Sequence, residues 1–260
     1  MKISYVSSQA ISQALRHSLL RSQSELVSAQ KEAQSGKVAD VGLALGIRTG
    51  QAVSLARDVG RLQTIVDANT LVASRLAATQ DSLSRVSEAG SAFLSAVTAA
   101  ISGDSDPATT RQAGRVMGEA LTGIINSSFN GEHLFAGVNT DVRPLADYRA
   151  DPPSAAKTAF DAAFLAHFGF AQDDPAAVAI DRPAITAFLD GPAVAEFLGA
   201  GWNANWSNAT DQGISTRISL NETVETSVSA NIDGIRKMAM AATIVDDLFS
   251  SALNEGALQA

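Results

Sequence analysis

Side chains that could carry catalysis or bind a metal are few and scattered along this 260-residue chain. It contains no cysteine, so thiolate nucleophiles, disulfides and Cys-ligated metal clusters are excluded. Its three histidines, His17, His133 and His167, lie on different segments and form no His-x-x-x-His pair, the spacing typical of a zinc protease. His167 stands near Asp173 and Asp174, a cluster more typical of a solvated acidic loop than of a metal site.

Motifs for phosphate binding and acyl transfer are missing as well. No Gly-Lys-Ser/Thr follows Gly42 and Gly46, and no Gly-x-Ser-x-Gly elbow occurs. The adjacent Asp246 and Asp247 indicate a solvated helix face rather than a catalytic acid pair. The net charge of −8 argues against sequence-independent binding of nucleic acid, which needs cations to neutralise phosphates. We therefore expect no enzyme, with no catalytic residue, no cofactor, no metal and no nucleic-acid partner.

Helical periodicity dominates the first 130 residues. Residues 8–35 carry a thin coiled-coil-like seam of Leu15, Leu19 and Leu26, interrupted by serine and alanine. A lone helix with so little to bury is marginal in water, so we expect this segment to be disordered in the free monomer and to become ordered on assembly. Gly36 is typical of a helix C-cap, and the glycines of residues 37–50 indicate a loop or partly ordered connector.

The longest predicted helix runs from about residue 54 to residue 101, contains no proline and would span roughly 70 Å. We expect the seam residues from Leu55 to Val97 to build a helical bundle within the chain, and exposed faces of that bundle to mediate lateral packing into a ring. Asn69 lies within the seam, either as a register-setting polar residue or as an ordinary solvated or locally bonded one. The seam consists of Leu55, Val59, Leu62, Val66, Asn69, Leu76, Leu83 and Phe93.

A third helix is predicted after the break at residues 103–107. Asp106 as N-cap and Pro107 in the first turn form a strong start signal. Val116, Leu121 and Ile124 would share one face, and the helix would fold back antiparallel on the long one.

The middle of the chain differs in composition. Residues 141–211 carry 10 acids and 4 bases, and most of the aromatic residues and prolines fall in or near this stretch. Phe160, Phe164 and Phe168 recur at four-residue intervals and predict one helix face, around which Phe188, Phe197, Trp202 and Trp206 would close a small core. The pattern predicts a compact unit inserted into a helical frame, with a ligand-binding aromatic cage as the less favoured interpretation.

The last 50 residues predict a hairpin and a helix. Apolar residues at even spacing in residues 214–228 favour half-buried strands that turn near Asn221 and Glu222. A final helix over residues 231–253, capped by Asn231 or Asp233, would pack on the long helix.

Four stretches resemble the flagellin superfamily, and in particular its hook–filament junction branch (the third hook-associated protein) in its alphaproteobacterial form. The most specific is NGEHLFAGVNTDVRPLADY, residues 130–148, which includes Asn130, Gly131, Leu134, Phe135 and Gly137. The others are VGLALGIRTGQAVSL (residues 41–55), NTLVASRLAATQDSL (residues 69–83) and SVSANIDGIRKMAMA (residues 227–241).

The resemblance implies a structural protein of the bacterial flagellum that self-assembles as a ring between the first hook-associated protein and flagellin. It implies export through the flagellar type III apparatus with a chaperone, an extracellular location and no membrane insertion. The fold class is then mainly α, a long antiparallel helical rod with a β-hairpin and an inserted outer domain. Domains would be residues 1–45 (terminal helix and connector), 46–140 (rod), 141–212 (variable outer domain) and 213–260 (hairpin and return helix).

Two features bear on this interpretation. The N-terminal residues lack the organisation of a signal peptide, which predicts either a cytoplasmic protein or export by a route that reads no such signal. The long C-terminal heptad helix of the family is not evident, so we expect that this sequence is shortened at that end.

Alternatives remain open. A flagellin-type filament subunit belongs to the same class. A cytoplasmic helical signalling rod would share the heptads but not the insertion rich in phenylalanine and proline, and an enzyme housed in the variable segment is the third possibility.

Overall fold

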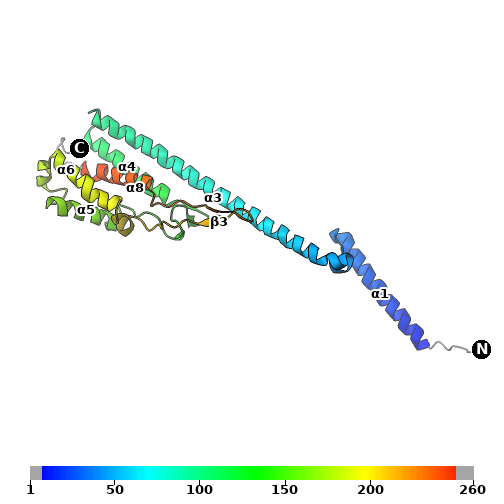
Figure 1. Ribbon diagram of the computed structural model, residues 1–260. Coiled ribbons are helices and arrows are strands. Elements are labelled where there is room, and N and C mark those ends of the chain that lie inside the picture. Colours follow the sequence, from blue (N-terminus) through cyan, green and yellow to red (C-terminus); the bar gives the residue numbers. More distant parts are fainter. Residues whose placement is uncertain (1–7, 250–260) are drawn as a thin grey trace, which may run out of the picture. The chain divides into compact units, whose positions relative to one another are not determined.

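The computed structural model describes residues 8–249. It divides the chain into two compact units, residues 1–64 and residues 65–260. Helices dominate both units, and the strands form two small antiparallel hairpins (Figure 1). The predicted fold class, mainly α with a smaller β part, is confirmed. Within residues 8–249, no helix is long and apolar enough to cross a membrane.

The first unit begins with helix α1 (Ser8–Ser35), where the sequence predicted it. The helix ends at Gly36, whose N–H donates to Glu32 O at 2.8 Å. The predicted loop that follows contains a short helix, α2 (Val41–Leu45), and a 3₁₀ turn, η1 (Gly46–Arg48). Glycine did not prevent this helix because Asp40 caps it, its carboxylate accepting from Leu43 N at 2.9 Å.

Helix α3 (Thr49–Ile101) matches the predicted long helix and ends at the expected residue. Its buried residues, Thr79, Ser82 and Val86, all lie in its C-terminal half, in the second unit. Leu55, Val59, Leu62, Val66 and Leu76 are exposed, whereas Leu83 and Phe93 are half-buried. The bundle expected over the whole seam is therefore built within the chain only toward its C-terminal end. The buried residues of α3 all belong to the second unit, which contains the core.

Helix α4 (Pro107–Ile125) starts as predicted, with Asp106 accepting from Thr109 N at 2.7 Å. Its buried face differs from the predicted one, because Val116 is 53% exposed. The buried residues are Thr110, Gly114, Met117, Leu121 and Ile125. These pack chiefly against helix α8 (Asp233–Leu248), which lies beside α4 in Figure 1. The hydrophobic pattern missed this buried face because it includes the polar Thr110 and the small Gly114.

The aromatic middle segment packs into the core of the second unit. It contains α5 (Ala155–Phe168), a 3₁₀ turn η2 (Pro175–Ala179), α6 (Arg182–Phe188), α7 (Val194–Phe197) and two π-helical turns, η3 (Leu189–Ala193) and η4 (Trp202–Trp206). Phe160 and Phe164 are fully buried, and Phe168 packs partly exposed beside them. Phe188, Phe197 and Trp202 are fully buried as well, which confirms the expected core.

Two hairpins flank this region. Strands β1 (Ser128–Phe129) and β2 (Glu132–His133) pair across the two-residue turn Asn130–Gly131. Strands β3 (Ser215–Arg217) and β4 (Thr223–Glu225) form the hairpin expected near residues 221–222. The expected half-burial holds around β3, where Ile214, Thr216 and Ile218 are half-buried and alternate with exposed residues, but it is wrong for β4, whose three residues are exposed.

Helix α8 starts at Asp233, with Ile232 in the N-cap position and no side-chain cap. The predicted cap was wrong because the Asn231 side chain is engaged elsewhere. It accepts from Trp202 Nε1 at 2.8 Å and donates to Ala209 O at 3.0 Å. The predicted end of this helix at residue 253 lies outside the described residues.

At Gly114 the backbones of α4 and α8 approach each other closely. A Cβ at this position would lie 2.7 Å from Asp246 N and 2.9 Å from Ala242 O, both of them backbone atoms of α8. We predict that Gly114→Ala lowers the free energy of unfolding by about 1–3 kcal/mol, because the helices must separate. Urea denaturation of the purified protein measures this change.

Gly123, in the same helix, is the matched control, since a Cβ there meets no atom within 4 Å. Gly123→Ala should raise the stability by up to about 1 kcal/mol through helix propensity alone. Equal effects of the two substitutions would contradict close packing at Gly114.

Candidate functional site

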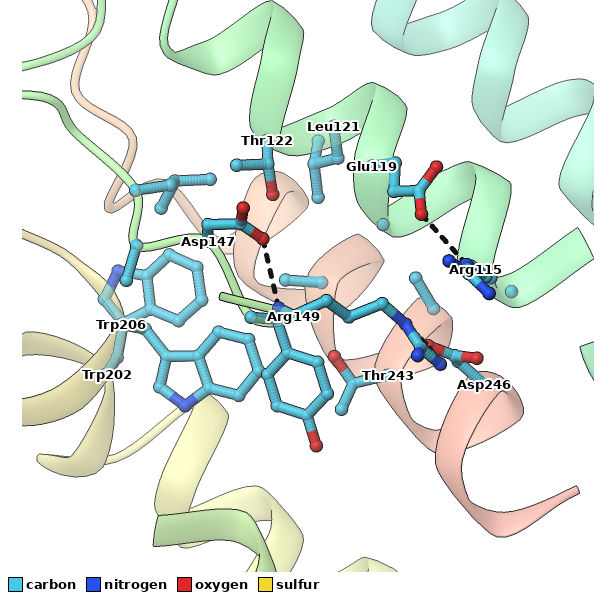
Figure 2. Close-up of a pocket in the computed structure, with 17 residues that line it drawn as sticks. Arg115, Glu119, Leu121, Thr122, Asp147, Arg149, Trp202, Trp206, Thr243 and Asp246 are labelled. Carbon is cyan, nitrogen blue, oxygen red and sulfur yellow. Dashed lines mark hydrogen bonds and ion pairs between the residues drawn. The ribbon is translucent and has the colours of Figure 1, made fainter. Parts of the chain in front are cut away.

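A narrow crevice of about 40 Å³ lies where α4, residues 145–149, α8 and the two tryptophans meet (Figure 2). On this measure one water needs about 10–15 Å³, so the crevice has room for only a few water molecules. The surrounding rings pack on one another instead. Tyr148 stacks on Trp206 with centroids 5.1 Å apart, and Phe197 lies 4.4 Å from the same ring. The aromatic residues thus pack as part of the core.

One edge of the crevice is a buried ion pair. Arg149 reaches across to Asp246 on α8 and donates to Asp246 Oδ2 from Nε at 2.7 Å and also from Nη2 (Figure 2). Arg111 Nε donates to the Asp246 main-chain oxygen at 3.0 Å. Asp246 is only 4% exposed, so the expected solvated face is wrong at this residue. The cations that neutralise it come from other segments, and only the tertiary fold brings them to it.

Its neighbour Asp247 forms a second, linked cluster. Its carboxylate accepts from Tyr148 Oη and pairs with Lys157 Nζ at 3.3 Å, and Lys157 also pairs with Asp161. The Asp247 side chain is largely buried too, which again corrects the expected solvated face. We call Asp246, Asp247, Tyr148, Arg149 and Lys157 the acid-pair clasp, because it holds residues 148–157 on α8.

Charge and burial shift the proton affinities of the clasp. Burial and the nearby Asp247 carboxylate raise the pKa of Tyr148 far above its ordinary value. Burial opposes the positive charges of Arg149 and Lys157, but hydrogen bonds and ion pairs with the aspartates outweigh it and raise the pKa of both. The cations Arg149 and Lys157 thus stay charged beside a neutral phenol, an arrangement suited to fixing structure.

The remaining chemical candidates are dispersed in the fold. His133 Nδ1 lies 2.9 Å from Asn126 O, and the His167 ring packs against Phe168 and Phe188. No group of three or more His, Asp or Glu side chains in the described part of the chain is arranged to hold a metal ion.

Residues of the 130–148 block serve the fold. Leu134 and Phe135 belong to the core, and Asn130 has the positive φ of 52° that a tight hairpin turn requires. Gly137 is buried against Thr210, where any side chain would collide. Arg75 on α3 pairs with Glu132 and donates to His133 O at 3.1 Å, which attaches this hairpin to the long helix.

Asn69 makes a long-range contact that neither interpretation of the sequence foresaw. Its Nδ2 donates to Ile218 O at 2.8 Å, next to strand β3. The residue is half-buried on α3, and its partner lies 149 positions further along the chain.

Two apolar seams lie open in the first unit. No residue of α1 is buried, and Leu15, Leu19 and Leu26 are all about 60% exposed. On α3, Leu55 is 65% exposed and Leu62 is 47% exposed, with Val59 between them on the same face. We call these residues the α1 seam and the α3 seam. Such apolar rows on helices are typical of surfaces that pack against another chain.

The protein-family model of the bacterial flagellin N-terminal helical region matches residues 6–140 of this chain, just over half of its length. The chain belongs to the bacterial flagellin family. Proteins of this family are extracellular structural components of the flagellum that self-assemble into axial polymers. The matched region includes both seams, helix α4 and the first hairpin. No curated protein and no solved structure gives a significant match.

The phenol of Tyr148 gives a pH-dependent prediction for this flagellin-family chain. Because its pKa is raised in the folded state, its stabilising contribution is complete below the unfolded-state pKa of about 10 and is lost as the pH rises further. With Tyr5→Phe, Tyr148 is the only tyrosine, and its ionisation is followed at 295 nm. We expect phenolate absorbance to appear together with alkaline unfolding, and ionisation near pH 10 in the folded protein would contradict a buried phenol.

The acid-pair clasp also predicts a stability difference between two ion pairs. Asp246→Asn should lower the free energy of unfolding by about 2–3 kcal/mol, since Arg149 loses its buried counter-charge. Glu119→Gln removes the exposed partner of Arg115 and should cost less than about 0.5 kcal/mol. Denaturation of both variants tests the difference, and a small loss in Asp246→Asn would show that the clasp does not stabilise the fold.

Proposed function

We propose that this chain is the hook–filament junction protein of a bacterial flagellum, which self-assembles as a ring between the first hook-associated protein and flagellin. The open α1 and α3 seams are the observation that carries the assembly role. Burying one leucine or valine side chain contributes about 1.5–3 kcal/mol, so seams covered by neighbouring subunits would supply much of the association energy. The mechanism is assembly rather than catalysis.

The junction role rests on the likeness of residues 130–148 to that branch of the family. Residues 141–211, which are acidic and rich in aromatic residues, would form the outward, variable domain. The four-part division at residues 45, 140 and 212 assigns the α1 seam to a terminal assembly segment, and the α3 seam to the rod. Export through the flagellar type III apparatus with a dedicated chaperone follows from the same proposal.

A flagellin-type filament subunit is the second candidate, because the matched helical region is shared by the whole family. The two roles differ in what a cell loses when the protein is absent. A junction protein is needed for flagellin to remain attached, whereas a filament subunit contributes to filament length or composition.

Cells that lack the gene test the proposal. We expect electron microscopy to show hooks without filaments, and immunoblotting to find flagellin shed into the medium. Normal filaments would contradict the junction role. Shorter or fewer filaments with no shed flagellin would favour the filament subunit.

Complementation of the same cells tests the seams. The double variant Leu55→Glu/Leu62→Glu places charges on the α3 seam, and we expect it to be secreted yet to restore fewer than about one tenth of the filaments, because burying unpaired charges is costly. Thr64→Glu is the control, an exposed position on the opposite side of the helix. Full restoration by the double variant would rule out the α3 seam as an assembly surface.

A further inference from the structure

Hairpin β3–β4 is a small element with little apolar support of its own. Each strand has three residues, and two-stranded hairpins of this size are at best marginally stable in water. Leu220 and Val224 are about 40% exposed. Its internal hydrogen bonds include Ile218 N to Glu222 O at 3.0 Å and a 2.9 Å contact between the Thr216 and Thr226 hydroxyls. These bonds hold the hairpin together. Its base is attached to residues 135–136 through Ala230 N, which donates to Phe135 O at 2.8 Å, and through the Ala136–Ser229 bridge, but none of these bonds reaches α3.

Helix α3 offers a repetitive surface. Apolar residues recur along it at spacings of three and four, so apolar contacts alone would favour positions one turn apart almost equally. A polar residue that must meet its hydrogen-bond partner removes this degeneracy, as one buried asparagine does in a coiled coil.

Asn69 has the geometry for this role. Its Nδ2 donates to Ile218 O, the carbonyl at the start of the hairpin turn, at 2.8 Å. Its Oδ1 is buried and, among residues 8–249, accepts no hydrogen bond. An amide that is only half satisfied adds little to stability, since desolvation of its second atom offsets the bond made by the first. Its net effect is therefore on the choice of position.

We propose that Asn69 is the residue that fixes the position of hairpin β3–β4 along helix α3, and that it does so at little or no gain in global stability. This role differs from the pairing of helices within a seam, and it is independent of where in the flagellum the chain assembles. The same helix attaches the other hairpin through Arg75 and Glu132, so both hairpins are positioned by polar residues six places apart.

Hydrogen exchange on the full chain tests the proposal. We expect the amides of Ile218 and Thr226 to exchange at least about fivefold faster in Asn69→Leu, which removes the amide, and in Asn69→Asp, which keeps its shape but lacks the N–H donor. Amides in α4 and α8 should keep their protection, and the thermal midpoint of Asn69→Leu should not fall. Gln80 carries an exposed amide on the same helix, so Gln80→Leu is the matched control and should change neither the exchange of the hairpin amides nor the thermal midpoint.

The position itself can be measured because the chain has no cysteine. Spin labels on Glu222→Cys and Ser84→Cys should give one narrow distance distribution, which broadens or splits when Asn69→Leu is added. Unchanged exchange and an unchanged distribution in Asn69→Leu would overturn the proposal. So would preserved protection in Asn69→Asp, or a general loss of protection with a lower thermal midpoint, which would indicate an ordinary structural role.

Discussion

The close approach of α8 to α4 is the contact on which the second unit depends. Gly114 has no side chain, so the backbone of α8 can lie directly against α4 at Ala242 and Asp246. This approach brings Asp246 to Arg111 and Arg149, and it positions the remainder of α8 for its other contacts. A side chain at residue 114 would separate the two helices and weaken each of these contacts together.

Helix α8 then holds the aromatic region through polar contacts near both of its ends. Near its C-terminal end the acid-pair clasp binds Tyr148, Arg149 and Lys157. Near its first turn, Arg236 donates to Phe197 O at 2.8 Å and to Gly199 O at 3.0 Å, next to the end of α7. Because paired charges and carbonyl contacts demand fixed geometry, they orient an aromatic core that apolar packing alone would specify less sharply.

The first unit has the opposite character. No residue of α1 is buried and the α3 seam is exposed, although both helices carry regular apolar rows. In the proposed assembly these rows stay exposed in the free chain, because the same residues cannot form both a monomer core and a subunit contact. One chain thus combines a unit that has its own core with a segment whose apolar rows are exposed.

The sequence by itself determined helices α1, α3, α4, α5 and α8 and the aromatic region, because their signals are local. Asp106 with Pro107 marked the start of α4, Gly36 marked the end of α1, and the phenylalanines spaced by four marked α5. Only the tertiary structure decided which faces are buried and which charges pair. The buried face of α4 runs through Thr110 and Gly114, which no hydrophobic count selects, and Asp246 is neutralised by arginines 97 and 135 residues away. The hydrogen bond from Asn69 to the Ile218 carbonyl likewise could not be predicted from sequence spacing, because it depends on how distant segments fold together.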